Sequence, residues 1–79
     1  MIYYVVIFSQ MNINDIGGLM RKRRLVLGID QRALSEISGI AVHTLSNIEA
    51  GKGNPTVTTL ARILDALGME ISVNVKERE

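Results

Sequence analysis

The sequence contains no cysteine, one histidine and one proline. Without cysteine the chain forms neither a disulfide framework nor a thiolate metal site, and one histidine cannot build a histidine cluster. Paired-carboxylate and phosphate-loop patterns are also missing, so a general acid and base have few candidates. We therefore expect no metal, no cofactor and no catalytic residue, and an enzyme is the class that the sequence favours least.

Long hydrophobic runs are absent as well. The apolar segment IYYVVIF, residues 2–8, is far shorter than the roughly 20 residues of a membrane-spanning helix, and no basic residue precedes it. A cytoplasmic protein without a membrane partner is therefore expected. A chain of 79 residues allows one small domain. Because such a domain buries only about 60% of its unfolded surface, we expect oligomerisation to add stability.

Neither sign of charge dominates, since the formal net charge is +1. Residues 12–67 nevertheless carry seven Lys or Arg against five Asp or Glu, whereas the tail from Gly68 carries two against three. The excess is concentrated in the run Arg21–Arg24. Such a run is usually a solvated helix face, so by itself it is weak evidence of nucleic-acid binding.

The stretch Asp30–Ile48 is typical of two short amphipathic helices joined by a tight turn, one over residues 31–38 and the other from residue 42 to about 50. Asp30 is expected to cap the first helix, and Gly39 to end it at positive φ. Apolar residues recur at helical spacing and are expected to be buried: Leu34, Ile37, Leu45 and Ile48. The pattern predicts a helix-turn-helix.

The opposite face of the second helix is polar but nearly uncharged, which suits hydrogen bonding to base edges; its residues are Val42, His43, Thr44, Ser46 and Asn47. Asn47 is the main specificity candidate, because an amide pairs bidentately with adenine for about 1–3 kcal/mol of discrimination. For Val42, simple exposure and packing on a thymine methyl stay open. For His43, the alternatives are a surface histidine and a contact with base or phosphate.

A preceding helix is predicted from Ile13 or Asp15 to Leu27, with Asn12 or Asn14 as its cap and Gly28 as its stop. Its inward stripe has spacings of four, four and three: Ile16, Met20, Arg24 and Leu27.

Arg24 on this stripe needs a partner, because an unpaired buried guanidinium costs several kcal/mol. Glu49, at the end of the second motif helix, is the best-placed acid, so an Arg24–Glu49 ion pair is predicted. Arg21–Arg23 lie off the stripe and are expected to face solvent. Gly17 and Gly18 each lower helix propensity by about 1 kcal/mol, so packing must hold that turn.

A last helix is predicted from the Thr56 cap to Leu67, with Gly68 as its stop and a buried stripe of Leu60, Ile63, Leu64 and Leu67. Residues 69–76, MEISVNVK, alternate as a half-buried strand does. Residues 2–8 are β-branched and aromatic, which favours a strand but leaves a buried helical turn open.

A lone strand must find a partner for its backbone groups. That partner is residues 2–8 of the same chain, the equivalent strand of a second copy, or both. We favour a two-fold homodimer with strands exchanged or paired across the axis, burying Ile71, Val73 and Val75. The expected organisation is an N-terminal strand or extension (1–11, with Met11 as an alternative start candidate), a helix-turn-helix domain (12–68) and a dimerisation strand with its tail (69–79).

The run from Ile16 to Gly68 resembles the lambda-repressor-like helix-turn-helix family, also called Cro/cI-type or XRE-type. The motifs that carry the resemblance are a basic helix ending in LG, the Gln after the cap, ALSEISG, LSNIEAGK and NPTVTTLARILDALG. The resemblance implies a mainly α fold of four to five helices. The strand in place of a fifth helix resembles the HipB-like subgroup, whose C-terminal strands pair across a dimer and whose members act as antitoxins and repress their own operons.

The resemblance also implies roles for individual residues. Gln31 would contact a phosphate and brace the recognition helix. Val42, His43 and Asn47 would face the bases, with Thr44 and Ser46 nearby for backbone or base contacts. Lys52 and the exposed members of Arg21, Lys22 and Arg23 would contact phosphates. Arg24 and Glu49 would form the internal ion pair. Two departures are Ala41, where the family usually has a capping Ser or Thr worth about 1 kcal/mol, and Ala33, which lacks the acid of a capping box.

The function implied is that of a sequence-specific transcriptional regulator, a homodimeric repressor that binds double-stranded DNA at an inverted-repeat operator through residues 42–50. The alternative, from another class, is an antitoxin-type interaction module that neutralises a co-encoded toxin protein, with autorepression secondary. The apolar segment at residues 1–8 favours this alternative.

Overall fold

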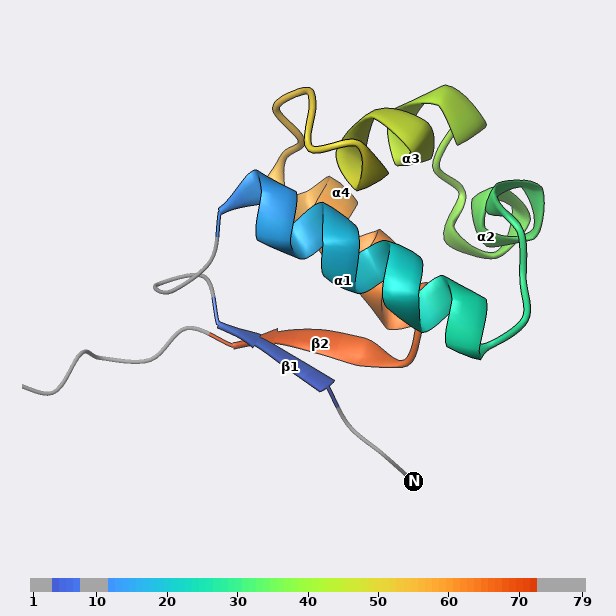
Figure 1. The fold of residues 1–79 in the computed structure, drawn as a ribbon, viewed down its shortest axis with the longest axis horizontal. Helices are drawn as coiled ribbons and strands as arrows, with labels where there is room; N and C mark the ends of the chain where they lie inside the picture. The colour runs from blue at the N-terminus through green and yellow to red at the C-terminus, as the bar shows by residue number, and fades with distance from the viewer. Residues whose placement is uncertain (1–3, 8–11, 73–79) are drawn as a thin grey trace, which may run out of the picture.

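The computed structural model describes residues 4–7 and 12–72 (Figure 1). Four helices lie between two short strands, in the order β1 (Tyr4–Ile7), α1 (Ile13–Val26), α2 (Gln31–Ser38), α3 (Val42–Glu49), α4 (Val57–Ala66) and β2 (Met69–Ser72). In Figure 1, α1 crosses the middle of the molecule, with α3 on one side of it and the strands on the other. The expected mainly α class is confirmed. None of the helices in the described residues is long and apolar enough to cross a membrane.

The helix starts follow from local side-chain chemistry. Asn12 accepts a hydrogen bond from the backbone N–H of Asp15 at 3.0 Å, and the Asp15 carboxylate accepts from the Asn12 N–H at 3.2 Å. This reciprocal capping box satisfies two donors at the start of α1. Thr56 caps α4 in the same sense, its hydroxyl accepting from the Thr59 N–H at 3.1 Å. Of the two caps considered for α1, the structure therefore selects Asn12.

One apolar core is enclosed by the four helices and β2, and its buried residues are Ile16, Met20, Leu34, Leu45, Ile48, Leu60, Ile63, Leu64, Leu67 and Met69. Two residues expected in it lie outside. Leu27 is 42% exposed because α1 ends at Val26, and after the turn Ile29 packs against the core instead.

Ile37 is the second exception, with 61% of its surface exposed. The inward side of α2 runs through Gln31, Leu34 and Ser38, at spacings of three and four. Ile37 lies beside this row and does not pack against the core. The prediction that Ile37 is buried is therefore wrong.

The two strands pair in parallel within the chain, with Tyr4 opposite Met69 and Ile7 opposite Ser72. This pairing corresponds to the first of the three partners considered for the C-terminal strand. Met69 is buried and Ile71 packs half-buried against the core, as the alternation predicts. Val73 and Val75 lie outside the described residues, and pairing between two copies stays a prediction.

Candidate nucleic-acid interface

The outward face of α3 is the candidate interface. Leu45 and Ile48 point into the core. The residues on the opposite side are exposed, except for half-buried Thr44; they are Val42, His43, Ser46 and Asn47. Within the described residues, no side-chain hydrogen bond or ion pair involves these five. The fold therefore leaves this face free for contacts with another molecule.

The C-terminal end of α3 is held by ionic contacts from α1. Arg24 donates from Nε to Glu49 Oε2 and from Nη2 to Glu49 Oε1, both at 2.9 Å, and from Nη1 to the Ile29 carbonyl at 3.0 Å. The predicted Arg24–Glu49 ion pair is thus present, and both side chains are almost fully buried. Its bidentate geometry is the stronger form of such pairs.

The hydrogen bond with Glu49 raises the pKa of the Arg24 guanidinium, against the opposing effect of burial. A raised pKa means that the charged guanidinium stabilises the fold at every pH below the ordinary pKa of arginine, and that this contribution is lost only at higher pH. The ion pair is therefore a permanent support for α3 and not a pH switch.

Gln31 completes this arrangement from α2. Its Nε2 donates to Glu49 Oε1 at 3.3 Å, so one carboxylate ties α1, α2 and α3 together. A shallow pocket opens where the three helices meet, and it is lined by Arg21, Arg24, Gln31, Ser46, Glu49 and Ala50. Gln31 therefore lies where it can brace α3 and still border the exposed face.

Close backbone contact between α1 and α3 depends on Gly17. A Cβ at this buried position would overlap the carbonyl oxygen of Ile48. Gly18, one residue later, has open space around it. The sequence indicated only that packing must offset the low helix propensity of both glycines, and the structure shows that one of them is required by a crossing.

The two motif helices differ at their N-termini. Asp30 caps α2, accepting from the Ala33 N–H at 2.8 Å, and Gly39 ends the helix in the left-handed region at φ 74°. Ala41 precedes α3 and makes no side-chain capping bond. The missing cap that the sequence indicated is therefore a feature of the folded protein.

The loop after α3 forms the other border of the interface. The Lys52 N–H donates to the Asn47 carbonyl at 2.8 Å, so the chain folds back over the last turn of α3. Exposed Lys52 lines a second pocket together with His43, Thr44, Asn47, Ile48, Gly53, Asn54 and Pro55. The sequence identified residues 53–55 only as turn formers, because composition does not indicate which face a loop borders.

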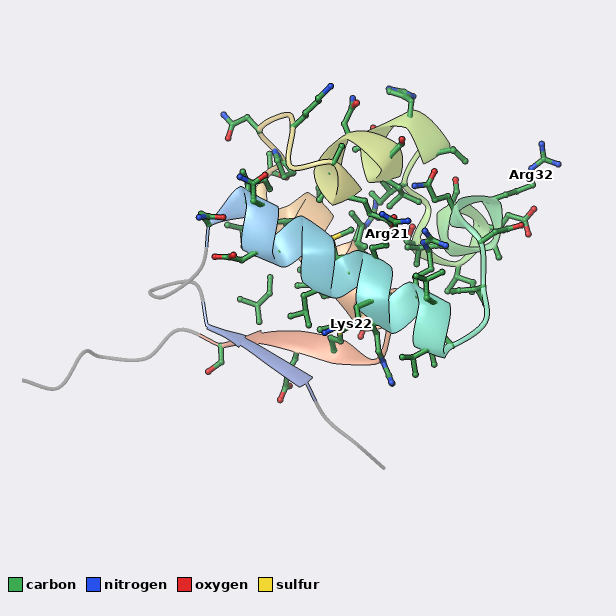
Figure 2. All side chains as sticks on the ribbon, viewed as in Figure 1. Arg21, Lys22 and Arg32 are labelled. Carbon is green, nitrogen blue, oxygen red and sulfur yellow. The ribbon has the colours of Figure 1, made fainter. Side chains whose placement is uncertain are left out.

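The basic run of α1 does not form a single surface. Figure 2 shows Arg21 on the side of α1 toward α3 and Lys22 on the side toward the strands. Successive helical residues diverge by about 100°, which explains the separation. Arg21 remains a candidate phosphate contact, whereas the geometry does not place Lys22 with it.

Arg23 departs further from expectation. It is half-buried, and its Nε donates to the carbonyl oxygen of Leu67 at 2.9 Å, at the C-terminal end of α4. A cation there satisfies one of the carbonyls that a helix end leaves without a partner. The prediction that Arg23 faces solvent is therefore wrong, and its role in the described structure is to join α1 to α4.

These features define a helix-turn-helix DNA-binding domain: two short helices in fixed relation, with a polar, exposed outward face on the second. Residues 20–74 match the family model described as Helix-turn-helix. The chain belongs to the lambda-repressor-like, XRE-type helix-turn-helix family of DNA-binding transcriptional regulators, which are not enzymes.

Two relatives illustrate the match. An uncharacterized HTH-type transcriptional regulator of Haemophilus influenzae is 38% identical over 50 residues, covering 63% of this chain and 51% of that protein. The HTH-type transcriptional regulator PuuR of Escherichia coli is 35% identical over 52 residues, covering 66% of this chain and 28% of PuuR. The chain thus spans about half of the first relative's length and less of the second's.

Proposed function

We propose that this chain is a sequence-specific repressor that binds, as a homodimer, an inverted-repeat operator through α3. The observation that carries the proposal is the outward face of α3, whose five side chains make no hydrogen bond or ion pair within the described residues, while Arg24 and Gln31 hold the helix through Glu49. A cytoplasmic location is part of this proposal. The names of the two relatives support the regulatory role.

In this proposal the residues divide between reading sequence and positioning. Asn47 pairs with an adenine, Val42 packs on a thymine methyl, and His43 contacts a base or phosphate. Thr44 and Ser46 make adjacent backbone or base contacts. Phosphate contacts come from Gln31, Arg21 and Lys52, and they supply most of the affinity.

The dimer is assigned to the strand side of the molecule. A two-stranded sheet of four-residue strands is marginal by itself, so pairing with a second copy would extend it. Ile71, Val73 and Val75 are the residues assigned to this interface. Two copies related by a two-fold axis would place their α3 helices about 34 Å apart, in successive major grooves.

Fluorescence anisotropy tests the proposal directly. The purified protein is titrated into a labelled fragment of its own upstream region and into a scrambled duplex, at several salt concentrations, with the stoichiometry measured in parallel. We expect a preference of about a thousandfold or more for the native fragment, an affinity that falls steeply with salt, and two chains per site. Weak binding that ignores sequence would overturn the proposal.

Asn47→Ala separates base reading from phosphate contact. We expect it to flatten discrimination at one operator position in each half-site, by about 1–3 kcal/mol. Lys52→Ala is the matched control, because losing a phosphate contact weakens native and scrambled duplexes alike. Unchanged base preference in Asn47→Ala, measured on operators with single base-pair changes, would refute the role of Asn47.

A second candidate is an antitoxin-type module of the HipB-like kind, which neutralises a co-encoded toxin and represses transcription secondarily. Its support is the apolar N-terminal segment, part of which forms β1 beside β2. Co-purification with the product of a neighbouring gene would favour this candidate. A strictly homodimeric protein with tight operator binding would argue against it.

A further inference from the structure

Arg32 is an exposed cation that neither the motif pattern nor the core accounts for. It lies in the first turn of α2, directly after Gln31. Figure 2 shows its side chain extending outward from α2, away from the other helices. Within the described residues it makes no hydrogen bond or ion pair, including with Glu36 one turn later.

Helix stability does not explain an arginine at this position. The N-terminus of a helix carries partial positive charge, so a cation in the first turn is repelled. No acidic residue lies in the first turn of α2, and the Asp30 carboxylate, which caps the helix by accepting from the Ala33 N–H, makes no ion pair with Arg32. The position of Arg32 is unfavourable for α2 itself, which points to a role outside the fold.

The location of Arg32 suits a partner with regularly spaced negative charge. Figure 1 shows α2 and the loop after α3 on opposite sides of α3. Arg32 and Lys52 therefore bracket the proposed DNA-reading helix. A major groove is about 12 Å wide and bordered by phosphates on both sides, so a helix inserted into it leaves long flanking cations within reach of the backbone.

We propose that Arg32 contacts a DNA phosphate at the edge of each half-site, on the side opposite the Lys52 contact. This inference rests on the proposed function and adds Arg32 to the phosphate contact that Gln31 supplies from the first turn of α2. The guanidinium supplies a charge-assisted, bidentate contact, which adds affinity without reading sequence.

The test compares wild type, Arg32→Gln and Arg62→Gln, in the full chain, on the native fragment and the scrambled duplex across a salt series. Arg62 is an exposed cation on α4 that lines a groove with β2, away from α3. Both variants lower the charge of each chain by one, so Arg62→Gln controls for net charge. Thermal melting, measured in parallel, is expected to show Arg32→Gln at least as stable as wild type, because the variant removes a cation from the N-terminus of α2.

Arg32→Gln is expected to lower the slope of log affinity against log salt by about 0.9 for each contact, or about 1.8 for a dimer. Native and scrambled duplexes should weaken by the same factor, and Arg62→Gln should keep the wild-type slope. Equal slopes for Arg32→Gln and wild type, or equal losses in both variants, would overturn the role of Arg32 alone. A wild-type protein that binds neither duplex would instead overturn the proposed function.

Discussion

Helices α2 and α3 each have eight residues, but they are held in place in different ways. α2 is capped at both ends by the residues that flank it in sequence, Asp30 at its N-terminus and Gly39 at its C-terminus. α3 has no side-chain cap, and its support comes from α1 and α2 at the opposite end, through Glu49. The helix that carries the candidate DNA contacts is therefore positioned by tertiary contacts and not by local ones.

This difference has a functional consequence. Val42 and His43 lie in the first turn of α3, the end that nothing caps, whereas Asn47 lies near the anchored end. A residue that reads a base must be held firmly, because a small displacement breaks a bidentate hydrogen bond. We therefore predict that Asn47 contributes more to sequence specificity than Val42 or His43.

The largest expected effect comes from removing the anchor of α3. Arg24→Met leaves the Glu49 carboxylate buried without its charge partner, and we expect a loss of about 4 kcal/mol in the free energy of unfolding. Urea denaturation followed by circular dichroism measures this loss. The free energy of unfolding of a small domain is only about 5–15 kcal/mol. Much of the variant population should therefore unfold under mild conditions.

The double variant Arg24→Met with Glu49→Leu is the control for that experiment. It replaces both charges by apolar side chains of similar volume, which is often neutral for a buried pair. We expect it to recover most of the stability. A single variant as stable as wild type would contradict the anchoring role of the pair.

The crossing of α1 and α3 predicts the next largest effect. Gly17→Ala drives a Cβ into the Ile48 carbonyl and should destabilise the protein by about 2 kcal/mol. Gly18→Ala meets open space within a helix and should stabilise it by about 0.5–1 kcal/mol. In thermal melting we expect the melting temperature to fall in Gly17→Ala and to rise in Gly18→Ala. A rise in both variants would show that α1 and α3 do not cross closely at Gly17.

The smallest effects concern the caps. Asp30→Ala should remove about 1 kcal/mol by leaving the Ala33 N–H without its acceptor, whereas Ala41→Ser should add about 1 kcal/mol by supplying the cap that α3 lacks. Each change corresponds to a melting shift of about 4–8 °C. If Ala41→Ser has no effect, the start of α3 is already held by contacts other than a side-chain cap.

Local chemistry explains why much of the fold could be predicted. Asp30 and Thr56 accept from amides three residues later, and Gly39 ends α2 through its own backbone, so the sequence alone indicates these caps. For α1 the sequence left Asn12 and Asn14 open, and the structure selects Asn12. The Arg24–Glu49 pair was also predictable, since a charge on an apolar stripe requires a partner and few acids are available.

The wrong predictions concern the exposure of single side chains. Whether Ile37 is buried depends on which row of α2 meets its neighbours, and Leu27 depends on where α1 stops. Arg23 bonds a carbonyl 44 positions away in the chain, which no local pattern indicates. Arg21 and Lys22 are both exposed, as predicted, but they lie on different sides of α1 (Figure 2), which follows from the helix period.

The sequence by itself therefore determined the helices, their caps, the polar face of residues 42–47 and the family, because each rests on spacings shorter than two helical turns or on contiguous motifs. Only the tertiary structure decided that Gly17 is required, that β1 and β2 pair in parallel, and which cations surround α3. The physical reason is that side-chain exposure is a property of contacts between elements, and the distances between elements are set only when the core is packed.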